Sequence, residues 1–205
     1  MLLGGLLQEG WRDAAPWGYP HQVELALIAG VFRAQTPQGN VDGVVDHVMH
    51  SRSHSLLDDL GDLANGGVGA VVNSLGPRWG DTNVLGVPVL RAAVIHEAAV
   101  ALLELGVRSA RDLQEAALQR PDAVSAAALS VRGLGPGTWE WIAFLSHAHI
   151  PPDAAVVGFL GELLDDADLS RDDAAELIRL TARRFASDER MLAHALRTHL
   201  DARDA

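Results

Sequence analysis

The chain has 205 residues, of which 48% are hydrophobic, and its formal net charge is −11 at neutral pH. This length is enough for one large domain or two small lobes around a sizeable core. The chain contains no cysteine, which excludes disulfides, zinc–thiolate sites, iron–sulfur clusters and cysteine nucleophiles. All sixteen basic residues are arginine, so no side-chain amine is available to form a Schiff base.

In chain order, the predicted elements are an irregular arm and then helices only. Residues 1–20 are rich in Gly, Trp and Pro, which is typical of irregular structure. Apolar residues then recur at the helical period, and the predicted helices cover 21–35, 41–50, 55–63, 68–75, 88–105, 109–118, 122–131, 136–147, 153–164, 171–185 and 188–200. Thr36-Pro37 is expected to end the first of them, and Ser109 is the expected N-cap of the sixth. Because Ala and Leu dominate and no stretch alternates as a strand would, we predict an all-α protein.

No apolar stretch approaches the roughly 20 residues needed to cross a bilayer. The opening MLLGGLLQEGWRDAAPW has no basic region and too short an apolar run for a signal peptide. We therefore expect a cytoplasmic protein with no membrane partner.

The negative charge argues against nonspecific binding of nucleic acid, because duplex affinity depends mainly on cationic side chains. The acidic residues are concentrated in residues 42–62 and 162–176, whereas residues 120–149 are balanced in charge. The charge therefore does not exclude a nucleic-acid-binding surface in residues 120–149.

That segment contains a candidate hairpin, Gly133-Leu134-Gly135, between two predicted helices, with Pro136 starting the second. The glycines permit positive φ and leave backbone N–H groups uncovered, and Leu134 is expected to tuck back between the helices. The start of the second helix is a ready site for a phosphate. Such a hairpin grips a nucleic-acid backbone without many cationic side chains.

A carboxylate that follows the hairpin, Asp153, is a candidate catalytic group. Asp153 lies eighteen residues after Gly135, follows Pro151-Pro152 and opens a predicted helix. A carboxylate there could stabilise an oxocarbenium ion or activate a water that attacks a sugar carbon. The alternative is a helix N-cap, and the spacing alone does not decide between the two roles.

Hairpin and carboxylate together resemble a known superfamily. Gly133-Leu134-Gly135-Pro136-Gly137-Thr138, followed by the Pro-Asp pair, is similar to the helix-hairpin-helix, Gly/Pro…Asp superfamily of base-excision DNA glycosylases, which includes endonuclease III, the adenine glycosylases and the bacterial 3-methyladenine glycosylases. The early helix VELALIAGVFRAQT is similar to that superfamily's helix ending in Ala-Gln-Thr or Ala-Gln-Ala. The resemblance covers about residues 21–165.

The resemblance implies a role for each matching residue. Asp153 corresponds to the catalytic aspartate, and Gln35 to the glutamine that probes the gap left by the extruded base. The hairpin residues, Gly133, Leu134, Gly135, Gly137 and Thr138, correspond to those that hold a phosphate beside the flipped nucleotide. The implied fold has two lobes: a six-helix, barrel-like lobe over 21–149 that ends in the hairpin, and a second helical lobe made of 1–20 and 150–205, with the DNA cleft between them.

The implied activity is that of a monofunctional DNA glycosylase without an iron–sulfur cluster. It acts as a monomer on double-stranded DNA with a damaged base in the bacterial nucleoid, and it needs no cofactor or metal. Bifunctional members carry lysine where this chain has Gly137, so we expect no lysine-dependent lyase activity. In the superfamily, the catalytic aspartate is often followed by a pattern that ends in a basic residue, whereas this chain has Ala154, Ala155 and Gly158 there. The chain also has Trp139 where the superfamily usually has a small residue.

Two other function classes stay open. One is a catalytically inactive relative that binds DNA or protein through the same fold, and the other is a helical interaction protein unrelated to DNA.

The aromatic candidates and Gln35 each have a structural alternative to the functional role. Trp141, one turn after Gly137, borders a base pocket or packs in the core, and Trp79 is a duplex wedge or an ordinary loop residue. Gln35 is a probe or a cap. The histidines lack metal-ligand spacing.

Overall fold

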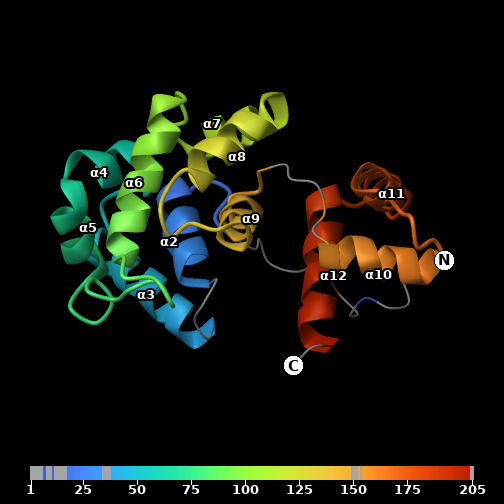
Figure 1. Cartoon of the computed structure of the whole chain (residues 1–205), viewed down its shortest axis with the longest axis horizontal. Coiled ribbons are helices and arrows are strands. Elements are labelled where there is room, and N and C mark those ends of the chain that lie inside the picture. Colours follow the sequence, from blue (N-terminus) through green and yellow to red (C-terminus); the bar gives the residue numbers. More distant parts are fainter. Residues whose placement is uncertain are drawn as a thin grey trace. The chain divides into compact units, whose positions relative to one another are not determined.

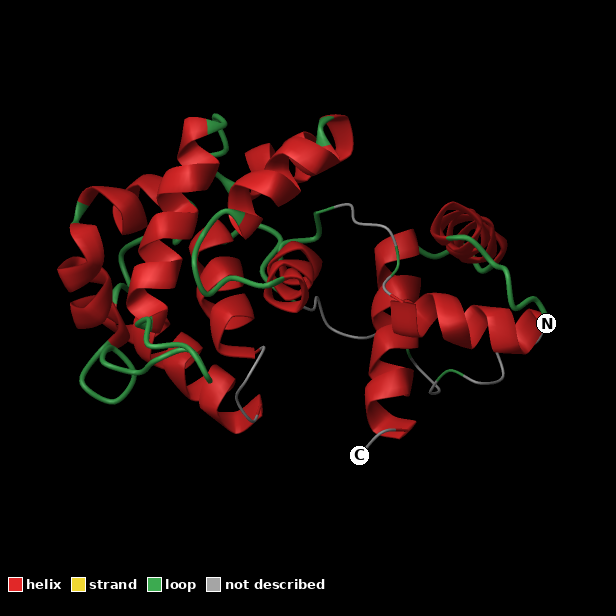
Figure 2. Ribbon diagram, in the orientation of Figure 1, coloured by secondary structure: helices red, strands yellow, loops and turns green. Residues whose placement is uncertain are grey.

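The structure is a computed structural model that describes residues 7, 11, 18–33, 38–148, 152 and 154–203. The described residues form eleven helices and no strand, and the prediction of an all-α protein is confirmed. Figure 2 shows the helices in red, joined by loops and turns in green. The chain divides into two compact units, residues 18–150 and residues 1–17 with 151–205. None of the described helices is long and apolar enough to cross a membrane.

The larger unit is built around one buried helix. Its described helices are α2 (Val23–Arg33), α3 (Gln38–Ser51), α4 (Leu60–Asn65), α5 (Gly67–Leu75), α6 (Arg91–Glu104), α7 (Ala110–Gln119), α8 (Pro121–Leu129) and α9 (Pro136–Leu145). Ten of the eleven residues of α2 are buried, and α2 contacts α3, α4, α6 and α9. Figure 1 shows α2 between α6 and α9. Apart from Glu24, the buried residues of α2 are apolar on all sides of the helix, which suits such a central position.

The packing of α2 on α9 depends on a glycine. A Cβ atom added to Gly30 would lie 2.4 Å from Cγ1 of Ile142 and 2.9 Å from its backbone nitrogen. Both distances are far below van der Waals contact, so glycine is what lets the two backbones approach so closely. Ile142 is itself buried, and this contact fixes the register between α2 and α9.

Helix ends follow the predicted signals where the signal is local. Ser109 caps α7 in a capping box with Asp112, and Pro121 and Pro136 occupy the first positions of α8 and α9. Thus both Ser109 as an N-cap and Pro136 as a helix start are confirmed.

Two helices begin later than predicted, and in each case the chain turns first. The helix expected from residue 88 begins at Arg91, because residues 84–89 form a loop closed by a hydrogen bond from the Val84 amide to the Val89 carbonyl, 2.9 Å. The helix expected from residue 55 begins at Leu60, after a turn in which Leu57 has a φ of +57°.

The smaller unit contains three described helices, α10 (Ala154–Leu164), α11 (Arg171–Arg184) and α12 (Glu189–Arg203). Each of the three contacts the other two, and Figure 1 shows them in orange and red. Their small core includes Phe159, Leu160, Ile178, Leu192 and Leu196. Arg179 pairs with Glu176 on the surface.

Candidate nucleic-acid interface

The hairpin between α8 and α9 is tight, and its leucine points inward. The Leu134 amide donates to the Val131 carbonyl at 3.1 Å, which closes the turn. Leu134 is only 4% exposed and belongs to the core of the larger unit. The structure thus confirms that the Leu134 side chain turns back into the core.

Gly133 is required in this hairpin for two reasons. Its φ of +95° lies in the region that residues with a side chain rarely adopt. In addition, an added Cβ atom would lie 3.0 Å from Cγ2 of Val94, a buried residue of α6. The glycine thus lets the loop turn and lets it rest against α6.

The start of α9 presents its backbone amides. Gly135 is the N-cap, with φ −90° and ψ 172°, and its carbonyl accepts from the Trp139 amide at 3.0 Å. A Cβ atom added to Gly135 or Gly137 would meet nothing within 4 Å. Within the part of the chain that the structure describes, no protein group accepts a hydrogen bond from the amides of Gly135, Gly137 or Thr138. These donors sit at the positive end of the helix dipole.

Thr138 differs from its two neighbours because it is buried, with 8% of its surface exposed. Its hydroxyl is therefore part of the packing, and what it offers a ligand is its backbone amide. Trp139 is also buried, 5% exposed, in the core of the larger unit. The core thus accommodates the large side chain at this position.

Trp141 lies on the same face of α9 as Gly137, one turn further on, and is half-buried. The guanidinium carbon of Arg33, the last residue of α2, lies 4.3 Å from the centroid of its ring. Phe144 meets the Trp141 ring edge-on, with centroids 5.7 Å apart. The structure thus brings Gly137, Trp141 and Arg33 together along one side of α9.

Trp79 is half-buried and packs on α3. A Cβ atom on Gly43 would lie 3.2 Å from its ring, the His47 ring centroid is 5.7 Å away, and the Arg78 guanidinium carbon lies 5.1 Å from its centroid. The ring therefore helps hold its loop against the helix. This placement favours the packing role of Trp79 over that of a wedge.

Gln35 and Asp153 lie outside the described residues. The neighbouring Ala154 and Ala155, at the start of α10, are described and exposed. The roles of Gln35 and Asp153 thus stay predictions from the sequence.

Sequence reasoning missed two arginines near the hairpin. Arg33 ends α2, and Arg91 begins α6, one turn before the Val94 that meets Gly133. The Arg91 guanidinium carbon lies 5.1 Å from the ring centroid of Phe32, and burial lowers the pKa of Arg91 from its ordinary value. The only signal in the sequence is that each arginine stands at the end of a predicted apolar helix.

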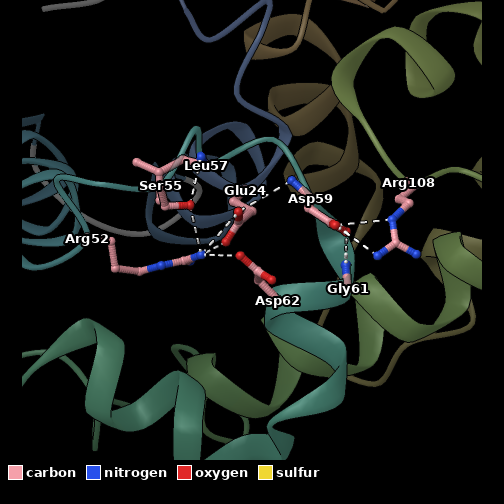
Figure 3. A network of polar contacts seen from close by, with 8 residues as sticks. All are labelled: Glu24, Arg52, Ser55, Leu57, Asp59, Gly61, Asp62 and Arg108. Carbon is pink, nitrogen blue, oxygen red and sulfur yellow. Dashed lines mark hydrogen bonds and ion pairs between the residues drawn. The ribbon is translucent and has the colours of Figure 1, made fainter.

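A buried carboxylate lies elsewhere in the larger unit (Figure 3). Glu24, in the first turn of α2, has no exposed surface. It forms an ion pair with Arg52, which also contacts Asp62 at 2.6 Å, and it accepts from the Asp59 amide at 3.4 Å. Burial raises the pKa of Glu24, and the hydrogen bond and charge of Arg52 act against that rise.

This network joins three elements that are distant in sequence. Asp59 caps α4 by accepting from Gly61, 2.8 Å, and pairs with Arg108, 2.8 Å, just before α7. The polar groups of the network are thus satisfied by one another, which is the condition for burying a charge at acceptable cost. We assign Glu24 a role in folding, because its partners hold α2, α4 and α7 together.

Among the described residues, no three His, Asp or Glu side chains converge on a point that could hold a metal ion. His47 packs on Trp79, and His50 contacts the Asp46 carbonyl at 2.8 Å. Both histidines thus have local structural contacts.

Comparison with known proteins identifies one family. A family model described as a domain of unknown function, DUF8548, matches residues 6–199. No curated protein sequence and no solved structure matches the chain. The matched stretch includes nearly all of both compact units, so the two occur together in one family-wide domain.

Proposed function

The chain belongs to the DUF8548 family, and we propose that it is a monofunctional base-excision DNA glycosylase with the two-lobed helix-hairpin-helix fold. It holds the phosphate beside a flipped, damaged nucleotide on the first amides of α9. Asp153 then promotes hydrolysis of the bond between base and sugar, and the product is an abasic site.

One observation carries this proposal: a tight helical hairpin that ends in backbone amides from which no described residue accepts a hydrogen bond. The Gly133 turn directs the chain into α9, and the open surfaces at Gly135 and Gly137 leave room for a strand to approach. Amides at a helix start suit a phosphate because the donors and the helix dipole act together. They carry no formal charge, so they support strand binding by a chain whose net charge is −11.

The proposed chemistry needs only one acid group. As the glycosidic bond breaks, positive charge develops on the sugar, and a carboxylate beside it stabilises that charge or takes a proton from the attacking water. Because the chain has no lysine, no side-chain amine is present to attack the sugar carbon. Hydrolysis without strand cleavage is the expected outcome.

A panel of lesion-containing duplexes tests this function. Each duplex carries one alkylated, deaminated or oxidised base, and strand breaks are measured with and without alkali after incubation with the protein. We expect breaks for at least one lesion only after alkali, because alkali cleaves at abasic sites. A strand break without alkali would contradict the monofunctional assignment. Binding of every duplex with no base release would overturn the enzyme assignment.

A second function is a non-catalytic protein that binds DNA or another protein through the same hairpin. The observation that favours it is the exposed pair Ala154 and Ala155 at the start of α10, where the superfamily that the chain resembles often carries a pattern that ends in a basic residue. The same panel separates the two functions, because the binding protein retains duplexes and releases no base.

A further inference from the structure

We propose that the chain associates with a second copy of itself through its smaller unit. Leu180 of one copy enters a groove beside α10 of the other, and Arg183 and Arg184 pair with the carboxylates that line this groove. The residues that carry the inference all belong to α10, α11 and the segment between them. It therefore depends on neither the hairpin nor the glycosylase proposed above.

The groove is formed where the chain after α10 folds back onto that helix. The Asp166 amide donates to the Gly161 carbonyl at 2.9 Å. A Cβ atom added to Gly161 would lie 2.6 Å from the Asp166 carbonyl oxygen, so only a residue without a side chain allows this approach. Because the contact holds the segment after α10 against the helix, the groove is a preformed feature of the smaller unit.

This α10 groove is lined by apolar and acidic groups. Its lining includes the apolar residues Val157, Gly158 and Leu169 and the carboxylates Glu162, Asp165 and Asp166. No basic residue is among the described residues that line it, and the end of α10 adds the negative end of a helix dipole. The groove has a volume of about 230 Å³, below the about 300–1,000 Å³ of most small-molecule sites. It therefore suits one apolar side chain flanked by positive charge.

The exposed face of α11 presents such a side chain. Leu180 stands two residues after the buried Ile178, on the opposite side of the helix, and 49% of its surface is exposed. Arg183 and Arg184 are exposed and lie one turn further along the same face. Among the described residues, no other exposed leucine is followed by arginines at both of these spacings. Leu180, Arg183 and Arg184 together form the α11 knob.

The groove and the knob are complementary in polarity and in charge. Burying the exposed half of the Leu180 side chain raises an association constant by about tenfold. Two copies that each carry a net charge of −11 repel each other, and the pairing of arginines with carboxylates makes this approach the favoured one. The contact is small, so we expect it to be weak and to require a high protein concentration.

Sedimentation equilibrium measures the association directly. The wild-type protein is centrifuged at concentrations from about 10 µM to 1 mM, the range in which a weak interface is populated. We expect the weight-average mass to rise above the 21.8 kDa of one chain as the concentration increases. A protein that stays monomeric over the whole range, as the resemblance implies, would overturn the inference and leave the proposed glycosylase unaffected.

Two substitutions remove the apolar part of the contact, one on each side. Leu180→Ala is expected to weaken association by about tenfold, whereas Leu118→Ala, at an exposed leucine of α7, should not change it. Gly158→Leu fills the α10 groove and should weaken association by at least as much. A Cβ atom added to Gly158 or to Gly69 of α5 meets nothing within 4 Å, so Gly69→Leu is the matched control and should associate as the wild type does.

An exchange of charges tests the electrostatic part. One variant carries Arg183→Glu with Arg184→Glu. The other carries Glu162→Arg with Asp166→Arg, and circular dichroism verifies the helix content of both. Each variant alone brings like charges together, so each should stay monomeric.

In an equimolar mixture of the two variants, every groove meets a knob of opposite charge on the other protein. Association should therefore return to the wild-type level, which also shows that both variants are folded. Three results would overturn the inference: wild-type association of either charge variant alone, no association in the mixture, or wild-type association of Leu180→Ala together with Gly158→Leu.

Discussion

Replacing Asp153 with asparagine is expected to lower the rate of base release by about 10²- to 10⁴-fold, the range typical of a positioned acid or base. Asparagine has nearly the same size, but it carries no negative charge and accepts no proton from water. The rate is measured in single-turnover reactions on the best duplex from the lesion panel. Affinity for that duplex should be unchanged, because the amides of α9 carry the binding.

The same variant separates catalysis from helix capping. Asparagine caps helices as well as aspartate does, so a capping Asp153 would tolerate the substitution without loss of activity. Asp188→Asn is a matched control, since Asp188 accepts from the Arg190 amide at 2.7 Å at the start of α12. A rate for Asp153→Asn equal to that of the control would remove Asp153 from the mechanism.

Replacing Arg52 with methionine is expected to lower the free energy of unfolding by about 3 kcal/mol at neutral pH. The variant leaves the Glu24 carboxylate buried without its main partner, which is the costly way to break such a pair. Arg52 is 20% exposed at its side chain, so water partly reaches the pair and the lower end of the usual range applies. Denaturant unfolding measures the loss.

The loss should depend on pH in a defined direction. Burial already raises the folded-state pKa of Glu24 above its ordinary value of 4.5, and removal of Arg52 raises it further. Stability contributed by the protonated acid is complete below the unfolded-state pKa and disappears as the pH rises through the folded-state pKa. The deficit of Arg52→Met should therefore be small near pH 4.5 and grow as the pH rises.

A double substitution checks the cause. In Glu24→Gln with Arg52→Met no unpaired charge is buried, so this protein should be more stable at neutral pH than Arg52→Met alone. Arg111→Met removes an exposed pair with Glu115 and should lower the free energy of unfolding much less than Arg52→Met does, because water screens an exposed pair. A double variant as unstable as Arg52→Met would show that the loss does not come from the Glu24 charge.

Local signals in the sequence predicted the helices well. The apolar period located α2 and α11 to within two residues at each described end, and Ser109 and Pro136 identified the starts of α7 and α9. The hairpin was predicted equally well, because glycines on both sides of Leu134 are typical of a tight turn between two helices. In each case the determining atoms lie within a few residues of one another.

Pairings between distant residues were not predictable from one sequence. Arg52 lies 28 residues from Glu24, and Arg33 and Trp141 stand on helices at opposite ends of the larger unit's sequence. The position of Trp79 in a loop bounded by Gly76 and Gly80 suggested an exposed aromatic residue, yet its ring packs on His47 of α3. Such contacts depend on how whole helices pack, as at Gly30, and no local pattern encodes them.

The claim that a strand phosphate sits on the first amides of α9 can be tested at Gly137. A Cβ atom added there meets nothing within 4 Å, and the helix dipole favours an aspartate in the first turn, so Gly137→Asp should fold at least as well as the wild-type protein. Gly137→Asn provides the same shape without charge. Gly69→Asp places a carboxylate on α5, at another position with open space, and should not affect DNA binding.

The most direct measurement is therefore the ratio of duplex dissociation constants for Gly137→Asp and Gly137→Asn at one salt concentration. A carboxylate beside a bound phosphate should weaken binding by about fivefold or more relative to asparagine. Equal dissociation constants for the two variants would contradict a phosphate at the start of α9.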